Sequence, residues 1–154
     1  MPPGRLRRGN HNVHQLYVHL VFVVKWRDSR LSADEEHKYF AIFDGICRDE
    51  RLNCQLLSMG TDDNHVHLLV RFVPTLSISE LVKFLKGGFS YQLNKQSRDD
   101  ADGDASKSRK PFAWSSGYFV KSVGQSTMGQ TAGYIAGQGR KKQADLGGSE
   151  NKAA

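Results

Sequence analysis

The sequence predicts an α+β fold, in which an antiparallel sheet carries helices on one face. Four runs rich in β-branched and aromatic residues, a composition typical of strands, occur along the chain. Segments with apolar residues at helical spacing separate the first run from the second and the third from the fourth. A further helical segment follows the last run. The order is therefore β-α-β-β-α-β plus a C-terminal helix, which is the ferredoxin-like pattern.

The first strand is predicted from HQLYVHLVFVVKW, residues 14–26, which contains no Gly or Pro. Both of its faces are largely apolar, as is typical of a central strand. Residues 1–13 are polar, basic and marked by Gly and Pro, so we expect an arm that is not packed. A helix is predicted from Ser32 to about Glu50, because Ser32 and Glu35 have the spacing of a capping box.

Two strands are predicted next, at Cys54–Met59 and His65–Val73, with a turn at residues 60–64 between them. A second capping box, Ser77 to Glu80, predicts the start of the second helix. Because residues 97–110 alternate acids and bases with Gly, Ser and Asp, we expect a solvated loop after that helix.

A short strand at Gly117–Val123 and a helix from Thr127 to about Lys142 complete the predicted order. The helix contains four glycines, each of which costs about 1 kcal/mol relative to Ala in a helix interior. Alone, such a helix is poorly stable. Either contacts with partners hold it in place, or it is a mobile element that docks when needed. Residues 1–142 are expected to form one domain and residues 143–154 a disordered tail.

Composition limits the class of protein. The chain has 154 residues, with 22 Lys and Arg against 16 Asp and Glu, a formal charge of +6. A pI near 9.4 points to a polyanionic partner, nucleic acid first. The absence of a run of 18 apolar residues excludes a membrane span. Without an apolar stretch behind the basic N-terminus, we expect a cytoplasmic protein in which Cys47 and Cys54 are reduced thiols.

The sharpest candidates for chemistry are His65 and His67. Alternate residues of a strand share a face, so both imidazoles are expected on one face, with Val66 and Leu68 on the other. Two imidazoles placed in this way supply half of a divalent-metal site. The alternative is a pair of surface or hydrogen-bonded histidines on a half-exposed strand.

A metal site would need a third ligand from elsewhere. His19 lies on the first strand, which neighbours the third in this topology, and is either a ligand or a histidine bonded within the sheet. Asp62 and Asp63 are near in sequence, although turn aspartates usually cap backbone amides. Cys47 and Cys54 lack the close-pair spacing of a zinc site.

Two further features concern the last helix and the basic residues. Met128, Ala132 and Ile135 form an apolar stripe on that helix, and Tyr134 and Gln138 lie one turn apart on its polar face. There the two side chains can act together, or Tyr134 is simply an exposed tyrosine. The candidates for phosphate contact are Arg7, Arg8, Lys83 and Lys86. The alternative is that these side chains are solvated surface charges.

Together these parts resemble a known family. Asn64–Val70, which contains His65-Val66-His67, resembles the HUH motif (histidine, bulky hydrophobe, histidine) of the single-tyrosine transposases of small bacterial and archaeal insertion sequences. Tyr134–Gln138 resembles the tyrosine-x-x-x-glutamine segment of their C-terminal helix. Similar stretches, which extend the resemblance over roughly residues 5–142, are Arg7–Gly9, Tyr17–Phe22, Leu85–Gly87 and Trp114–Phe119.

The resemblance implies that His65, His67 and Gln138 hold Mg²⁺ or Mn²⁺ and that Tyr134 is the nucleophile. A hard cation polarises the scissile phosphate of single-stranded DNA, and a phenol needs an ion or a base to assist its attack. Attack at hairpin-bearing transposon ends would leave a 5′-phosphotyrosine link and a free 3′-hydroxyl. The resemblance also implies a homodimer, in which the tyrosine helix is able to serve the partner's histidines.

Two other functional classes stay open. One is a non-catalytic single-stranded nucleic-acid-binding module with this fold, or a decayed transposase copy. Such modules stack bases on exposed aromatic residues of the central strands, whereas the third strand here offers His65, His67 and Leu69. The other class is a metal hydrolase of small molecules, for which the chain lacks a carboxylate base at a recognisable spacing.

Overall fold

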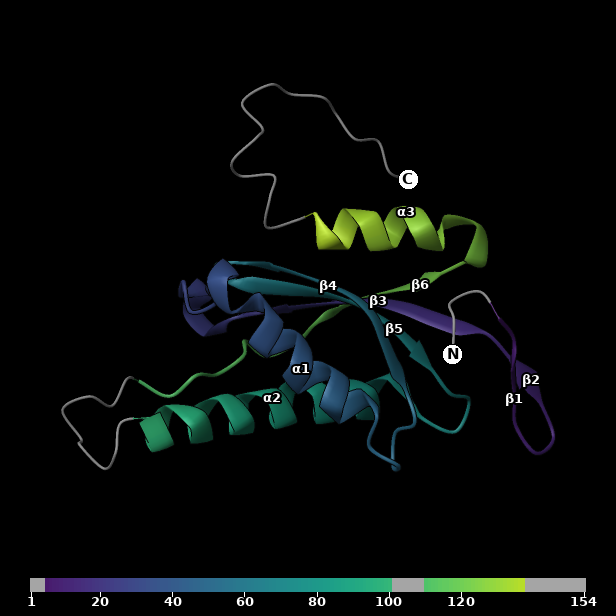
Figure 1. Ribbon diagram of the computed structural model, residues 1–154, viewed down its shortest axis with the longest axis horizontal. Coiled ribbons are helices and arrows are strands. Elements are labelled where there is room, and N and C mark those ends of the chain that lie inside the picture. Colours follow the sequence, from purple (N-terminus) through teal and green to yellow (C-terminus); the bar gives the residue numbers. More distant parts are fainter. Residues whose placement is uncertain (1–4, 101–109, 138–154) are drawn as a thin grey trace, which may run out of the picture.

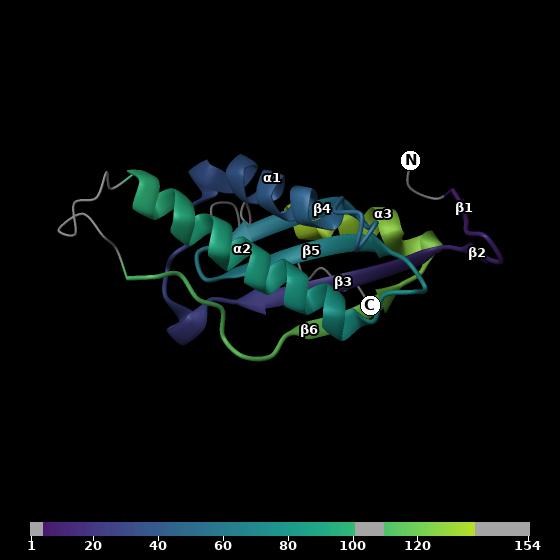
Figure 2. The same ribbon diagram turned by 90° about the horizontal axis from the view of Figure 1, so that it is seen from below.

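The computed structural model describes residues 5–100 and 110–137, and its centre is a four-stranded antiparallel sheet (Figure 1). The strand order is β4-β5-β3-β6, and the bounds are β3 Leu16–Val23, β4 Gln55–Asp62, β5 His65–Phe72 and β6 Phe119–Val123. Helices α1 (Glu36–Cys47) and α2 (Ile78–Asp100) lie together on one face, as Figure 2 shows. Helix α3 (Gln125–Ala136) lies on the opposite face. The predicted ferredoxin-like α+β fold is confirmed.

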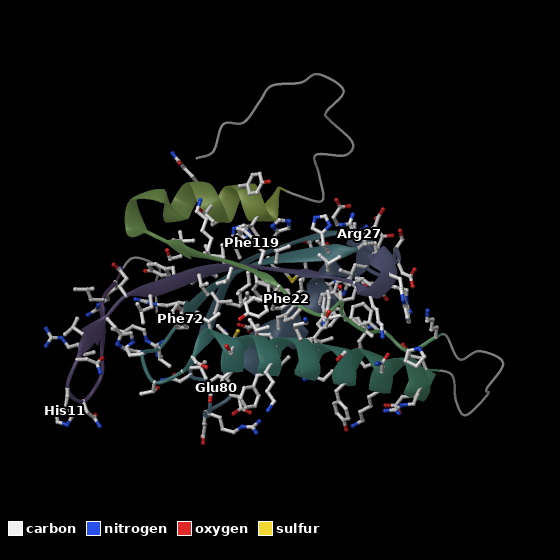
Figure 3. All side chains as sticks on the ribbon, turned by 180° about the vertical axis from the view of Figure 1, so that it is seen from behind. His11, Phe22, Arg27, Phe72, Glu80 and Phe119 are labelled. Carbon is white, nitrogen blue, oxygen red and sulfur yellow. The ribbon has the colours of Figure 1, made fainter. Side chains whose placement is uncertain are left out.

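The main core lies between the sheet and helices α1 and α2. Alternate residues of β3 and β5 point into it, and those of β3 include Leu20 and Phe22, neither of which is exposed. Figure 3 shows Phe22 between the sheet and α2. The rings of Phe43 from α1 and Phe89 from α2 stack with centroids 4.4 Å apart. Strand β3 is central, with β5 on one side and β6 on the other, as its apolar faces predict.

The expected unpacked arm is wrong for part of residues 1–13. Arg7–Arg8 forms strand β1, which pairs antiparallel with β2 (Val13–His14) in a small separate hairpin. The Arg7 guanidinium also donates to the main-chain oxygen and the Oδ1 atom of Asn53, at 3.1 and 3.2 Å. These bonds attach the hairpin to the turn that follows α1.

The first capping box does not form as predicted. The Tyr39 hydroxyl accepts a hydrogen bond from the Ser32 amide at 3.1 Å and donates to the Glu35 carboxylate at 3.0 Å. Glu35 is therefore used by Tyr39 instead of reaching back to Ser32. Ala33–Glu35 makes a 3-10 turn, and α1 begins only at Glu36. In the second capping box, Ser77 Oγ does accept the amide of Glu80, at 3.1 Å.

Several predicted bounds are also wrong. The first strand stops at Val23, before the predicted end at Trp26. Strand β4 continues to Asp62, because its pairing with β5 extends to the Asp62–His65 pair and leaves a two-residue turn. Helix α2 continues to Asp100, so the first residues of the expected loop are helical. Helix α3 begins at Gln125, earlier than predicted. None of the described helices is long and apolar enough to cross a membrane.

Candidate active site

Strand β5 places the two histidines of the motif on the sheet face that carries α3. His67 and Leu69 are buried on this face, and His65, the first residue of β5, is half-buried. Val66 and Leu68 point to the other face, where they belong to the main core. The two imidazole rings have centroids 5.1 Å apart. The prediction that both imidazoles share one face is therefore confirmed.

His67 is hydrogen-bonded to a third histidine from the neighbouring strand. Its Nδ1 atom lies 3.1 Å from Nε2 of His19, and the two rings are stacked with centroids 5.3 Å apart. This bond leaves Nε2 of His67 as the nitrogen that remains to bind a ligand. Of the two roles open to His19, the structure gives it the hydrogen bond within the sheet.

His65 is oriented by the residue before it. Its Nδ1 atom lies 2.8 Å from Oδ1 of Asn64, an oxygen that can only accept, so Nδ1 carries a proton and Nε2 is the ring nitrogen that can offer a lone pair to a ligand. That Nε2 atom lies 3.9 Å from the Asp62 carboxylate. Asp62 also accepts the amide of Asp63 at 2.8 Å, the capping role expected of a turn aspartate.

Burial keeps the inner two histidines neutral. Burial, and after it the nearby His65 and His19, lower the pKa of His67 from 6.5 to about 4. The pKa of His19 is also lowered, first by burial and then by Lys121. Because a metal binds the neutral imidazole, His67 is ready to act as a ligand throughout the neutral pH range.

Helix α3 brings Tyr134 over this face of the sheet. The ring of Tyr134 meets that of His67 nearly at right angles, at 88°, with centroids 6.3 Å apart, and 37% of the residue is exposed. The next residue, Ile135, is fully buried in a small cluster with Tyr17 and Leu69. The polar and apolar faces predicted for these two residues are confirmed.

Two contacts with β4 fix the height of α3 above the sheet. Ser58 Oγ donates to the main-chain oxygen of Ala132 at 3.1 Å. Gly60 lies directly under the helix, and a Cβ atom there would collide with the main-chain oxygen of Ile135. The absence of a side chain at Gly60 therefore allows the close approach that brings Tyr134 to His67.

Comparison with known proteins identifies the family. The family model described as "Transposase IS200 like" matches residues 12–138. The chain belongs to this family. It is an HUH single-tyrosine transposase, an enzyme that cleaves and joins DNA strands in the transposition of an insertion sequence.

Two relatives show how far the similarity extends. The transposase for insertion sequence element IS200 of Salmonella typhimurium is 30% identical over 110 residues, which are 71% of this chain and 68% of that protein. The ISDra2 transposase TnpA of Deinococcus radiodurans is 27% identical over 143 residues, which are 91% of this chain and 96% of that protein.

Two solved structures share the fold of this transposase. One, described as a transposase from Deinococcus radiodurans, has a TM-score of 0.63 and 23% identity and covers 86% of this chain and 98% of its own. The other is a REP-associated tyrosine transposase bound to a REP hairpin. It has a TM-score of 0.54 and 11% identity and covers 84% of this chain and 69% of its own.

Not every predicted site residue of the transposase can be placed. Gln138, the predicted third metal ligand, lies outside the described residues, as does the predicted tail at 143–154. Within residues 5–100 and 110–137, no three His, Cys, Asp or Glu side chains gather as a metal-binding group. Cys47 and Cys54 are buried free thiols whose pKa values burial raises, that of Cys54 to about 11.

The four candidates for DNA contact lie away from the histidines. Arg7 and Arg8 line a hollow of about 490 Å³ beside the small hairpin, which Glu50 and Arg51 also line, and Arg51 is ion-paired with Asp49 at 2.9 Å. Lys83 and Lys86 lie on α2, across the sheet from α3. The Lys86 ammonium donates to the main-chain oxygens of residues 115 and 117, at 2.7 and 2.9 Å. Their contact with DNA stays a prediction.

Two residues with clear roles at the site were missed by sequence reasoning. Asn64 orients His65, and its position directly before the motif was the signal that could have indicated it. Gly60 allows α3 to approach, but it falls in a stretch that reads as a turn. The role of Gly60 is visible only in the packing contact between β4 and α3, two segments that are far apart in the sequence.

Proposed function

We propose that this transposase cleaves single-stranded DNA by attack of Tyr134 on a phosphodiester that lies over His65 and His67. The observation that carries this proposal is the ring of Tyr134 standing edge-on to that of His67 in the same chain. The Tyr134 oxygen forms a bond to phosphorus and loses its proton, while the bond from phosphorus to the 3′ oxygen breaks and that oxygen gains a proton. The product is a 5′-phosphotyrosine and a free 3′-hydroxyl. Attack by another 3′-hydroxyl reverses the exchange and joins a new strand.

We further propose that His65, His67 and Gln138 hold Mg²⁺ or Mn²⁺. The donor set supports this, because Nδ1 of each histidine is engaged by a neighbour and Nε2 is left for a ligand. Gln138 would add an amide oxygen, and phosphate and water oxygens suit either ion. When bound, the ion supplies a Lewis acid for the phosphate oxygens. The partners of the histidines, His19 and Asn64, hold the rings in orientation and keep the proton on Nδ1.

The DNA is proposed to be a hairpin-bearing transposon end. A structural neighbour, the REP-associated transposase, is bound to a hairpin, and the formal charge of +6 suits a polyanion. The basic hollow beside β1 and β2 supports a role for Arg7 and Arg8 in phosphate contact. Lys83 and Lys86 are proposed as further contacts, on α2.

A homodimer is proposed, with strand β6 as the joining edge. Strand β6 lies at one edge of the sheet, and its exposed side chains include Phe119 at 51% and Val120 at 41%, which point to opposite faces. An edge strand with exposed apolar side chains is a template for pairing with a second copy. In such a dimer, α3 serves its own histidines as in this structure, or those of the partner. We place the protein in the cytoplasm.

The test of the proposed function is a covalent adduct. Purified protein with Mg²⁺ or Mn²⁺ should form an SDS-resistant adduct on single-stranded hairpin DNA, and Tyr134→Phe should abolish the adduct but keep DNA binding. Tyr91→Phe is the matched control, because Tyr91 is also exposed but lies on α2. An adduct that persists in Tyr134→Phe overturns the assignment of the nucleophile. DNA binding with no adduct, indifferent to metal and to the histidines, would instead favour a non-catalytic binding module.

A further inference from the structure

The chain makes a strained turn directly after β3. Trp26 and Arg27 have φ values of 59° and 54°, so two consecutive residues that are not glycine adopt the left-handed conformation. Side chains larger than that of glycine adopt it at a cost, because Cβ crowds the backbone. We call Lys25–Arg27 the Trp26 hook.

Surrounding hydrogen bonds hold the hook in this conformation. The Lys25 amide donates to the main-chain oxygen of Ala113 at 2.9 Å, and the Arg27 amide donates to that of Val24, also at 2.9 Å. The amide of Val24 in turn donates to Asn64 at 2.7 Å. The strained turn is thus imposed by its neighbours, the condition under which backbone strain persists.

The strain is not offset by burial of the tryptophan. Trp26 is 63% exposed, whereas Trp114, the other tryptophan of the chain, is only 9% exposed and belongs to the main core. A large aromatic side chain held out into solvent on a strained backbone contributes little to folding. Backbone strain of this kind clusters at binding and catalytic sites, so a binding role accounts for it better.

Cations surround the exposed indole. The Lys110 ammonium lies 3.5 Å from the centroid of the Trp26 ring, and that of Lys25 lies 4.6 Å away. Arg27, directly after Trp26, is a further cation of this segment, and Asp28 after it is an acid. An exposed aromatic face among several cations is the combination with which proteins bind single-stranded nucleic acid, through stacking on bases and attraction of phosphates.

The hook lies beside the histidine motif. Val23, three residues before Trp26, pairs with His65, and Asn64 both accepts the Val24 amide and orients His65. Figure 3 shows Arg27 at the end of the sheet toward which the C-terminal end of α3 points. A single DNA strand that lies across the histidines would therefore continue over the Trp26 hook.

We propose that Trp26 stacks on an unpaired base next to the cleaved phosphate, while Lys25, Arg27 and Lys110 contact the neighbouring phosphates. Binding exchanges the contact of Lys110 with the indole for a base on the ring and a phosphate on the ammonium. The inference rests on the proposed function, because it takes single-stranded DNA as the substrate.

The test measures the affinity for a labelled oligothymidylate, and for the same backbone with abasic residues, in the Tyr134→Phe background. Trp26→Ala should weaken binding to oligothymidylate by about fivefold or more, the low end for the loss of one stacked base. On the abasic strand the same substitution should have little effect. Tyr91→Ala removes an equally exposed aromatic side chain, 63%, from α2 and should leave both affinities unchanged.

A second variant separates binding from folding. Asn accepts the left-handed conformation more readily than Trp, so Trp26→Asn should leave the thermal midpoint equal or higher while it weakens binding as Trp26→Ala does. Unchanged affinity in both Trp26 variants, or equal loss on the abasic strand, overturns the inference. An adduct through Tyr134 together with unchanged affinity in the Trp26 variants would reject the DNA-binding role of the hook and leave the proposed function intact. A protein that binds no single-stranded DNA at all would reject the proposed function as well.

Discussion

The Nε2 atom of His19 lies 3.1 Å from the Nδ1 atom of His67, and both rings are buried on the sheet face under α3. For His67 to present the lone pair of Nε2 to a metal, its proton must stand on Nδ1, where His19 accepts it. His19 therefore selects the tautomer and the orientation of a proposed ligand without touching the metal itself.

His19→Leu should consequently weaken Mn²⁺ binding by about 10- to 100-fold, the usual effect of losing such a supporting partner. His19→Gln retains an oxygen that accepts the proton of Nδ1 and should recover much of the affinity. Calorimetric titration of Mn²⁺ into both variants, in the Tyr134→Phe background, makes the comparison. Equal affinity in the Leu variant and the wild type would show that His19 has only a packing role.

A second prediction concerns the contact between β4 and α3. Gly60→Ala places a methyl group against the main-chain oxygen of Ile135, so α3 must shift and carry Tyr134 away from His67. We expect adduct formation to fall at least tenfold. The matched control is Gly45→Ala on α1, where a Cβ meets no described atom within 4 Å. That variant should keep full activity and gain about 0.5–1 kcal/mol in stability. Normal adduct formation by Gly60→Ala would mean that α3 is not docked in this way during cleavage.

A third prediction follows from the pKa of His67, which is lowered from 6.5 to about 4. Between these values the unfolded chain binds more protons than the folded one, so the free energy of unfolding should fall as the pH falls from about 6.5 to about 4. The full loss is about 3 kcal/mol, at 1.36 kcal/mol per unit. Urea unfolding at neutral and at acidic pH measures it. His67→Gln removes this titration and should reduce the slope; an unchanged slope would assign the acid sensitivity to other groups.

Some of these features could be predicted from the sequence because they depend on local periodicity. The two-residue period of a strand sufficed to place His65 and His67 on one face, and the helical period separated Tyr134 from Ile135. The extent of α2 could not be predicted, because a solvated helix and a solvated loop have similar composition near Asp100. The role of Gly60 needs the packing of distant segments, which no local pattern contains.

The first capping box shows why a correct motif can still give a wrong boundary. Ser32 and Glu35 have the required spacing, but Tyr39 is also within reach and takes both bonds, accepting from one residue and donating to the other. In the sequence, Ser32 and Glu35 can bond to each other as a capping box, or each can bond to the Tyr39 hydroxyl. Burial of Tyr39 in the main core, where its ring meets that of Phe89 on α2, places its hydroxyl between the two groups.

The last prediction asks which subunit's tyrosine serves which histidines. Here Tyr134 stands over His67 of its own chain, held by buried Ile135 and by the close approach at Gly60. If the helix stays docked in this way, a mixed dimer of a His67→Ala subunit and a Tyr134→Phe subunit has no complete site. We therefore expect no adduct from such dimers, purified through two different tags, whereas dimers of wild type with either variant should keep one active site. An adduct from the doubly defective dimer would instead mean that α3 leaves its own sheet and completes the site of the partner, which would require the contacts of Ser58 and Ile135 to be remade across the dimer.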